Sequence, residues 1–203
     1  RQLASLQIGN HLKFSLINFS IMKIEFINHS SLIINIGKEK ILCDPWYKGS
    51  AFANGWRLLY DEKIDINKLD FDILWISHEH PDHFSIPTLK SLKQKKPVLY
   101  QKTKDKKIKR FLNLQGHKVT EMENDKKLQI GPAKISCIVT EGYDSCLLVE
   151  EGNFKFLNIN DSQLDKDEEI KKISHHTPID LISIQFHYAN WAGNKGDDLI
   201  PEF

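Results

Sequence analysis

The sequence predicts a layered α/β domain, and three observations support this fold class. Apolar and polar residues alternate in MKIEFINHSSLIINIG, which begins at Met22 and passes through a turn at residues 37–39 into KILCDPW, as expected for paired strands. The nearly continuous apolar run FDILWIS, from Phe71 to Ser77, is typical of a strand covered on both faces. Helical and strand patterns then follow in mixed order, which favours helices layered on sheets over an all-β sandwich.

Helices are predicted on both sides of a second group of strands. Ser85 is a good N-cap with Pro87 in the first turn, and a second helix is indicated by apolar spacing from Ile108 until Gly116 ends it. HKVTEM, AKISCIVT, SCLLVEE and FKFLNIND have strand patterns separated by turns. DKDEEIKKISHH is an acid-first, base-later helix that suits the helix dipole, and IDLISIQF is a further buried-type strand.

We expect a single domain, because the 203 residues are 40% hydrophobic and 27% charged, in the ordinary globular range. Residues 1–21 precede the first strand and are interpreted as an N-terminal extension, which leaves residues 22–203 for the domain. The chain ends at DDLIPEF without a terminating element of its own, so we expect the domain to be incomplete at its C-terminus.

The composition limits the partners and the compartment. The net charge of +1 provides no global field for nucleic acid or an anionic membrane, so binding partners must be argued from local features of the sequence. Cys43, Cys137 and Cys146 form no CxxC or CxH arrangement, which argues against a disulfide framework, a sulfur-bound zinc site or an iron–sulfur site. No stretch approaches the roughly 18–20 apolar residues of a membrane span. These features predict a cytoplasmic protein.

Metal-binding side chains gather directly after the apolar run, in HEHPDH at positions 78–83. In an extended segment residues two apart point the same way, so His78 and His80 can bind one ion while Asp82 and His83 turn toward a neighbouring position. Imidazole nitrogens suit zinc, and a carboxylate partly neutralises a second dication. The loop therefore predicts one or two divalent metal ions, with zinc favoured and manganese or iron as alternatives.

This HxHxDH string resembles the motif of the metallo-β-lactamase fold superfamily. INHSSLIINIGKEKILCDPW is also similar to the opening hairpin of the lactonase-like and phospholipase-like branch, with His29, Asp44 and Pro45 matching its histidine turn and Asp-Pro strand end. The likeness covers about residues 22–190. It implies an αββα sandwich and a metal-dependent hydrolase acting on a small ester, lactone or phosphodiester.

The resemblance further implies a ligand set and a catalytic residue. His78 and His80 would hold the first metal, Asp82 and His83 the second, and Asp161, which closes FLNIND, would bridge them. Metal-bound hydroxide would be the nucleophile, with Asp82 also orienting the attacking water.

The chain departs from the superfamily pattern in the loop that usually supplies a third histidine to the first metal. This loop reads TEGYDSC, so Glu141 or Asp144 takes that role or both are ordinary turn carboxylates. His187 follows the last strand and is either the final ligand of the second metal or a residue that lines the cleft, the true ligand then lying beyond Phe203.

Other features allow two interpretations each. Asp44 either orients a ligating histidine or serves the turn before Pro45, and His29 is expected near the cleft. The aromatic loop WYKGSAFANGW offers core packing or a substrate wall. The basic run from Lys93 to Arg110 is a solvated face or an attraction for a phosphate-bearing substrate.

Alternatives to a small-molecule hydrolase are a nuclease of the same fold and a non-catalytic metal-binding or interaction module. The balanced charge weighs against the nuclease. Flavin-linked diiron oxidoreductases resemble the loop but place a glutamate where His80 stands, which disfavours oxygen chemistry. The branch related to the sugar-nucleotide hydroxylase of sialic acid adds a Rieske centre, for which this chain lacks the CxH and CxxH pairs.

Overall fold

A computed structural model of the chain describes residues 17–18, 22–58, 64–140, 143–164 and 166–185. The strands are β1 Ile17–Asn18, β2 Met22–Asn28, β3 Ser31–Ile36, β4 Glu39–Cys43, β5 Ile73–Ile76, β6 Val98–Gln101, β7 Val119–Met122, β8 Lys127–Ile130, β9 Ala133–Val139, β10 Ser145–Glu151, β11 Phe154–Asn160 and β12 Leu181–Ile184. The helices are α1 Ile86–Ser91, α2 Lys107–Leu114 and α3 Asp167–Ser174, with short 3-10 turns at Phe52–Asn54 and Ile66–Lys68.

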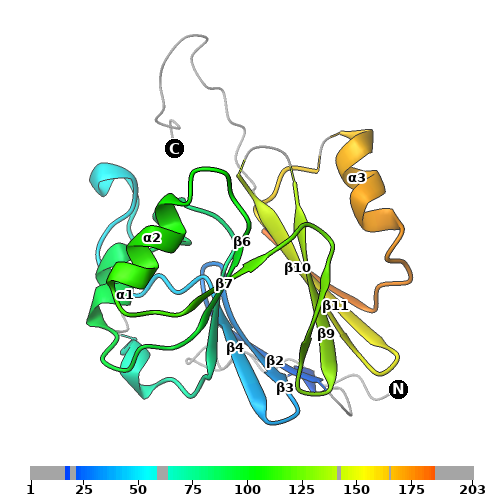
Figure 1. Cartoon of the computed structure of the whole chain (residues 1–203), viewed down its shortest axis with the longest axis horizontal. Coiled ribbons are helices and arrows are strands. Elements are labelled where there is room, and N and C mark those ends of the chain that lie inside the picture. Colours follow the sequence, from blue (N-terminus) through cyan, green and yellow to red (C-terminus); the bar gives the residue numbers. More distant parts are fainter. Residues whose placement is uncertain (1–16, 19–21, 59–63, 141–142, 165, 186–203) are drawn as a thin grey trace, which may run out of the picture.

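The strands form two sheets that face each other, with helices on the outside. The 7-stranded sheet has the order β1-β2-β3-β4-β5-β6-β7, and the 5-stranded sheet has the order β12-β11-β10-β9-β8. Helices α1 and α2 lie outside the first sheet and α3 lies outside the second (Figure 1). This arrangement confirms the predicted αββα sandwich.

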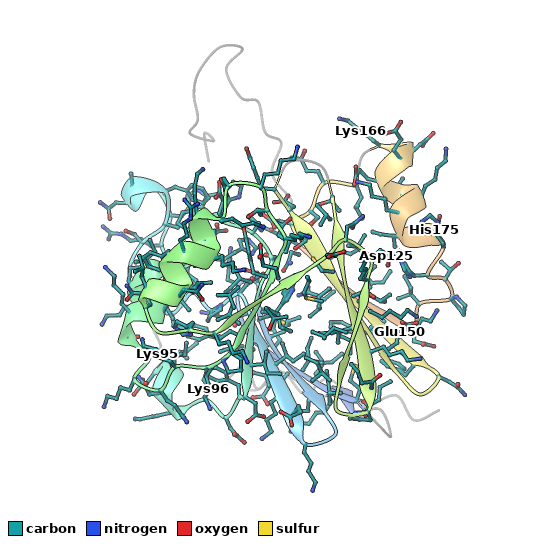
Figure 2. The ribbon with its side chains drawn as sticks, viewed as in Figure 1. Lys95, Lys96, Asp125, Glu150, Lys166 and His175 are labelled. Atoms are coloured by element: carbon teal, nitrogen blue, oxygen red, sulfur yellow. The ribbon has the colours of Figure 1, made fainter. Side chains whose placement is uncertain are left out.

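The apolar core has three parts, which explains the sequence patterns. Between the sheets, Trp75 packs with Ile34 and Phe156, whereas Leu74 and Ile76 on the other face of β5 pack toward the α1 and α2 side. Because β5 is covered on both faces, its sequence is apolar at every position, as predicted. A smaller cluster lies between the second sheet and α3. Figure 2 shows side chains filling the space between the sheets, with Lys95 and His175 at the outside.

The structure differs from the sequence-based expectation in several elements. Strands β6, Val98–Gln101, and β8, Lys127–Ile130, were not predicted, because VLYQ and KLQI are runs of only four residues, the first directly after Pro97. Strand β12 was expected to be buried, but Ile182 and Ile184 are exposed, because β12 is the edge strand of its sheet in the described part of the chain. Most of residues 1–21 lies outside the described residues, and Ile17–Asn18 pairs with β2. In the described part of the chain, no helix is both long and apolar enough to cross a membrane.

A tight contact between the sheets lies at the end of the sandwich remote from the HEHPDH loop. Gly37, in the β3–β4 turn, has φ +58°, and a Cβ atom added there would lie 2.8 Å from Cδ of Pro132 in the β8–β9 turn. The position therefore requires glycine both for its left-handed backbone and for the close approach.

We predict that Gly37→Ala lowers the free energy of unfolding by more than the about 1–2 kcal/mol expected for a left-handed alanine alone. Chemical denaturation measures the loss. Gly116→Ala is the matched control, because Gly116 has φ +88° but its added Cβ would meet only the flexible Lys95 side chain, at 3.4 Å. Equal losses in the two variants would contradict the proposed contact.

Candidate metal centre

Residues far apart in the sequence meet at one edge of the sandwich. Strands β4 and β5 run parallel, so Asp44 and the HEHPDH loop follow their carboxyl ends at the same edge. Strand β10 runs antiparallel to β11, so Asp144, which precedes β10, lies at the edge where Asp161 ends β11. The fold therefore brings a loop from each sheet to a shared site.

A first group of donor atoms comes from His78, His80 and Asp144, which all lie within 4.8 Å of one another. His78 Nε2 is 2.9 Å from His80 Nδ1, and His78 Nδ1 is 3.6 Å from Asp144 Oδ1. His78 is buried, whereas His80 and Asp144 are reached by solvent. The group combines two imidazoles with one carboxylate.

Two further groups continue from the first, one sharing His78 with it and the next sharing His83 with that second group. His78, His83 and Asp161 form one group, and His29, Asp82 and His83 form the other, each with donor atoms within 4.8 Å. His83 Nε2 lies 3.4 Å from both Asp82 Oδ2 and Asp161 Oδ1, and the His78 and His83 rings are 4.1 Å apart. The three groups thus form one continuous cluster.

Unpaired atoms in this cluster fit a bound cation. Asp82 Oδ1, His83 Nε2 and Asp161 Oδ1 are buried and make no hydrogen bond of normal geometry. Burying such atoms without a partner is costly, and buried carboxylates are normally paired or bound to a metal. Imidazole and carboxylate are the donors that zinc, iron and manganese accept. The residues present therefore fit one or two divalent ions.

Asp44 holds the loop that carries the histidines. It is fully buried and accepts hydrogen bonds from Ser77 N at 2.8 Å and Ser77 Oγ at 2.7 Å. His83 Nδ1 donates to Asp44 Oδ2 at 3.1 Å, which directs His83 Nε2 into the cluster. This is the contact of a residue that orients a ligating histidine, the first of the two interpretations of Asp44.

Ser77 and His29 also fix cluster residues. Because Ser77 Oγ donates to Asp44, it accepts from His78 Nδ1 at 3.0 Å. His78 Nε2 then carries no proton and accepts from His80 Nδ1 at 2.9 Å. His29 Nε2 donates to Asp82 Oδ2 at 2.9 Å across 53 positions of sequence. His29 and Asp44 both have positive φ, 43° and 40°, so strained backbone accompanies the site.

Burial and neighbouring charges divide the titrating groups into two kinds. Burial, together with His83, lowers the pKa of His78 to about 4, so His78 is neutral at pH 7. Burial and then the charge of Asp161 raise the pKa of Asp144 to about 6. Both shifts disfavour the charged form of an isolated group.

His83 behaves in the opposite way. Burial alone would lower its pKa, but Asp161, Asp44 and Asp82 raise the pKa of His83 well above its usual value. Burial opposes ionisation of Asp82 and Asp161, yet His29 and His83 hold the pKa of Asp82, and His83 that of Asp161, below the usual range. These neighbours therefore favour a proton on His83, whose single positive charge offsets part of the negative charge of the carboxylates.

The aromatic loop divides into a core part and an exposed part. Trp46 and Tyr47 are buried, as the core interpretation predicts. Phe52 is 41% exposed, with its ring centroid 4.9 Å from that of Trp56 and 5.8 Å from that of His80. Phe52 and Trp56 therefore form an aromatic wall beside the donor cluster.

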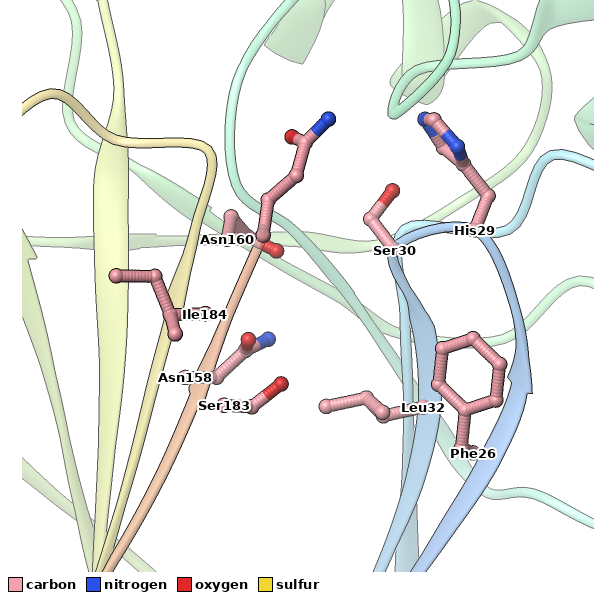
Figure 3. Close-up of a pocket in the computed structure, with 9 residues that line it drawn as sticks. Phe26, His29, Ser30, Leu32, Asn158, Asn160, Ser183 and Ile184 are labelled. Atoms are coloured by element: carbon pink, nitrogen blue, oxygen red, sulfur yellow. The ribbon is translucent and has the colours of Figure 1, made fainter. Parts of the chain in front are cut away.

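A cavity of about 260 Å³ opens beside His29, between the edges of the two sheets. In Figure 3, Asn158 and Ser183 point from the second sheet into the gap, and Leu32 faces them from the first. Asn158 Nδ2 and Asn160 Oδ1 are buried without hydrogen-bond partners. The cavity thus offers polar groups to a small molecule on one wall and apolar contact on the other.

The predicted ligands His78, His80, Asp82, His83 and Asp161 all lie in this cluster, and their binding of metal stays a prediction. Of the two carboxylates left open for the first metal, Asp144 lies in the cluster, whereas Glu141 is outside the described residues. His187 is also outside the described residues. Sequence reasoning missed Ser77, whose only signal was a hydroxyl residue between a buried strand and the histidines.

Comparison with known proteins agrees with the fold. A family model described as a beta-lactamase superfamily domain matches residues 23–167, so the chain belongs to the beta-lactamase superfamily. The structure of CmlA, a diiron β-hydroxylase from Streptomyces venezuelae, is similar with a TM-score of 0.64 and 20% identity, covering 80% of this chain and 34% of CmlA. A possible metal-dependent hydrolase from Veillonella parvula has a TM-score of 0.60 and 14% identity over 80% of this chain and 70% of its own. At these identities the structures support the fold alone.

Curated relatives are closer in sequence. The cytidine monophosphate-N-acetylneuraminic acid hydroxylase of Cricetulus griseus is 32% identical over 160 residues, which cover 70% of this chain and 27% of that protein. The human protein, named as an inactive form of the same hydroxylase, is 31% identical over 160 residues, 70% of this chain and 31% of its own length. The chain spans about a quarter to a third of the length of these relatives. The lack of CxH and CxxH pairs therefore argues against a Rieske centre within the given sequence and says nothing about a longer protein.

We predict that binding of a divalent metal releases protons, because His83 is protonated in the metal-free protein and must lose its proton to bind a metal. Because the pKa of His83 is raised, a proton competes with the metal for the His83 nitrogen at and above neutral pH. The affinity for metal therefore rises as the pH is raised toward the pKa of His83. Zinc titration calorimetry in two buffers of different ionisation enthalpy measures the release. Identical heats in both buffers would show that no proton leaves.

Proposed function

We propose that this chain is the metal-binding domain of a metal-dependent hydroxylase, with iron held by His78, His80 and Asp144. The observation that carries the proposal is that Asp144 completes a set of two histidines and one carboxylate around the first position. Such a set with open positions is typical of non-haem iron(II) oxygenases, and zinc peptidases also use two histidines and one carboxylate, so the choice of hydroxylation depends in addition on the relatives considered next.

Two further points support oxygen chemistry. The sequence argument against it rested on His80 standing where diiron oxidoreductases carry a glutamate, but Asp144 brings a carboxylate to the same group from the opposite sheet. The curated relatives at 31–32% identity over 160 residues are named as hydroxylases of a sugar nucleotide or as an inactive form of one. We extend that reaction class to this chain as a proposal.

When bound, the ion would supply activation of dioxygen, so that one oxygen atom enters a C–H bond and the other leaves as water with two electrons and two protons from a separate reductase. The chain supplies the surroundings. Neutral His78 offers an unprotonated nitrogen, Asp161 reaches toward both His78 and His83, and Asp44 keeps His83 oriented. The Phe52–Trp56 wall and the cavity beside His29 would orient a small substrate and limit access of water.

Exchange of the carboxylate tests the proposal. We predict that Asp144→His lowers the iron(II)-to-zinc affinity ratio about tenfold or more, since it replaces the oxygen donor by a third imidazole. Chelator competition with each metal measures the ratio. Asp144→Glu, which keeps the carboxylate, is the control and should stay close to wild type. An unchanged ratio in Asp144→His would sink the assignment of Asp144.

Turnover provides the functional arm of the same test. The iron(II)-loaded chain, given a chemical reductant and cytidine monophosphate-N-acetylneuraminic acid as the probe, should consume oxygen and yield hydroxylated product, and Asp144→His should not. Absence of oxygen uptake by the iron(II)-loaded chain, together with hydrolysis of the probe by the zinc-loaded chain, would contradict hydroxylation.

Hydrolysis of an ester, lactone or phosphodiester is the second candidate, and the His29–Asp82 pair favours it. His29 fixes one oxygen of Asp82, and the other, Oδ1, is buried without a partner, as suits a carboxylate that orients the attacking water. Hydrolysis of such substrates by the zinc-loaded chain, lost in Asp82→Asn, would favour this candidate over the hydroxylase.

A nuclease and a non-catalytic module are less well supported. In the basic segment, Lys106 and Lys109 pair with Glu121, and Lys102 pairs with Glu123, which weakens its attraction for nucleic acid. One curated relative, the human protein, is named as inactive, so a non-catalytic role for this chain is a possible result of the tests. Metal binding without turnover on any of these probes would favour it.

The aromatic wall gives a prediction about substrate binding. We predict that Phe52→Ala raises KM about two- to tenfold, the effect of losing one aromatic contact, and changes kcat less, because Phe52 contacts a ring of His80 and bears no reacting group. Steady-state kinetics measure both constants. Leu114→Ala, at a residue 84% exposed at the end of α2, is the control and should match wild type. A fall in kcat alone would contradict a binding role.

A further inference from the structure

Both backbone polar groups of Ser77 are hydrogen-bonded to side chains from other parts of the fold. Its N–H donates to Asp44 Oδ1 at 2.8 Å, and its carbonyl oxygen accepts from Ser145 Oγ at 2.7 Å and from Gln101 Nε2 at 3.2 Å. Ser77 immediately precedes His78, so any movement of this peptide moves the first histidine. A carbonyl with two donors from other strands is a fixed point in the fold.

Gln101 connects this fixed point to the opposite loop. It is the last residue of β6, is 3% exposed, and its side-chain amide also donates to the carbonyl oxygen of Tyr143. The two hydrogens of one NH₂ group therefore join the Ser77 peptide of the first sheet to the loop that precedes β10 in the second.

Asp144 lies between the two attachment points on that loop. Tyr143, before it, is bound through its carbonyl to Gln101, and Ser145, after it, is bound through its hydroxyl to the Ser77 carbonyl. The residues on both sides of Asp144 are thus tied, directly or through one amide, to the peptide that carries His78. Both connecting side chains are buried, with Gln101 3% and Ser145 0% exposed, so solvent has little access to their donor atoms.

We propose that Gln101 and Ser145 are positioning residues that set the separation between the His78–His80 pair and Asp144. The inference rests on the proposed role of Asp144 as a ligand and adds a mechanism by which ligands from two different sheets keep one geometry. Neither side chain belongs to the donor cluster, so each acts only through the backbone that it binds.

The test is a metal titration in a mutant cycle. Gln101→Met keeps the length and shape of the side chain but removes both N–H donors, and cobalt(II) is the probe because its absorption spectrum reports the ligand geometry. We expect Gln101→Met to weaken one cobalt site about 10- to 100-fold, the usual effect of losing a residue that orients a ligand. The weakened site should be the one lost in Asp144→Ala, and its spectrum should change.

The cycle separates positioning from a general loss of structure. If Gln101 acts through Asp144, then adding Gln101→Met to Asp144→Ala causes no further loss of affinity. Gln129→Met is the matched control, since the Gln129 amide also donates to two carbonyls, those of Gly131 and Ala133, both at 2.9 Å, but in the β8–β9 turn. It should leave cobalt binding unchanged. If Gln101→Met does not fold, the same comparison is made with Ser145→Ala, a smaller change, measured with and without Asp144→Ala.

Three results would overturn the inference: unchanged cobalt affinity in folded Gln101→Met and Ser145→Ala, an equal loss at both sites, or the same loss with and without Asp144. The proposed function has a separate point of failure. If Asp144→Ala weakens no site, the assignment of Asp144 as a ligand is wrong. If Asp144→Ala weakens a site and the two positioning variants do not, only the positioning role is wrong.

Discussion

A carboxylate that has no contact with solvent, Asp44, holds the loop of the candidate metal centre in place. A buried charge of this kind is tolerated only when its oxygens are satisfied, and here they accept from Ser77 twice and from His83 once. Ser77 precedes the HEHPDH loop and His83 ends it, so these bonds tie both ends of the loop to the Asp44 carboxylate. Because only five residues lie between the two ends, this attachment restricts where His78, His80 and Asp82 can lie.

The electrostatics of the cluster follow from the same constraint. His83 lies among Asp44, Asp82 and Asp161, which raise its pKa, whereas His78 faces another histidine and has its pKa lowered. In the metal-free protein the proton on His83 therefore does for the carboxylates what a cation would do. A divalent metal in place of that proton would offset one more negative charge, which fits the number of carboxylates that gather there.

The sequence alone predicted those features of the site that depend on residues close together in the chain. Period-2 alternation, the apolar β5 run and the spacing of HEHPDH each act within a few residues, and a resemblance added Asp161 and the αββα fold. The choice between Glu141 and Asp144 stayed open, because a turn carboxylate has the same local pattern with or without a metal. Strand β6 was missed for a related reason, since four residues after a proline carry little periodicity.

Contacts between distant segments were beyond sequence patterns. The His29–Asp82 bond spans 53 positions, and the Ser145–Ser77 bond spans 68 and crosses from one sheet to the other. Such pairs exist because parallel strands place their carboxyl ends at one edge and the second sheet presents its own loops there. A donor set drawn from both sheets can be adjusted from either side, so we expect a carboxylate on the β10 loop to alter the metal preference without any change in the HEHPDH motif. In this proposal the motif indicates a metal site, and the residue from the opposite sheet tunes which metal and which reaction the site favours.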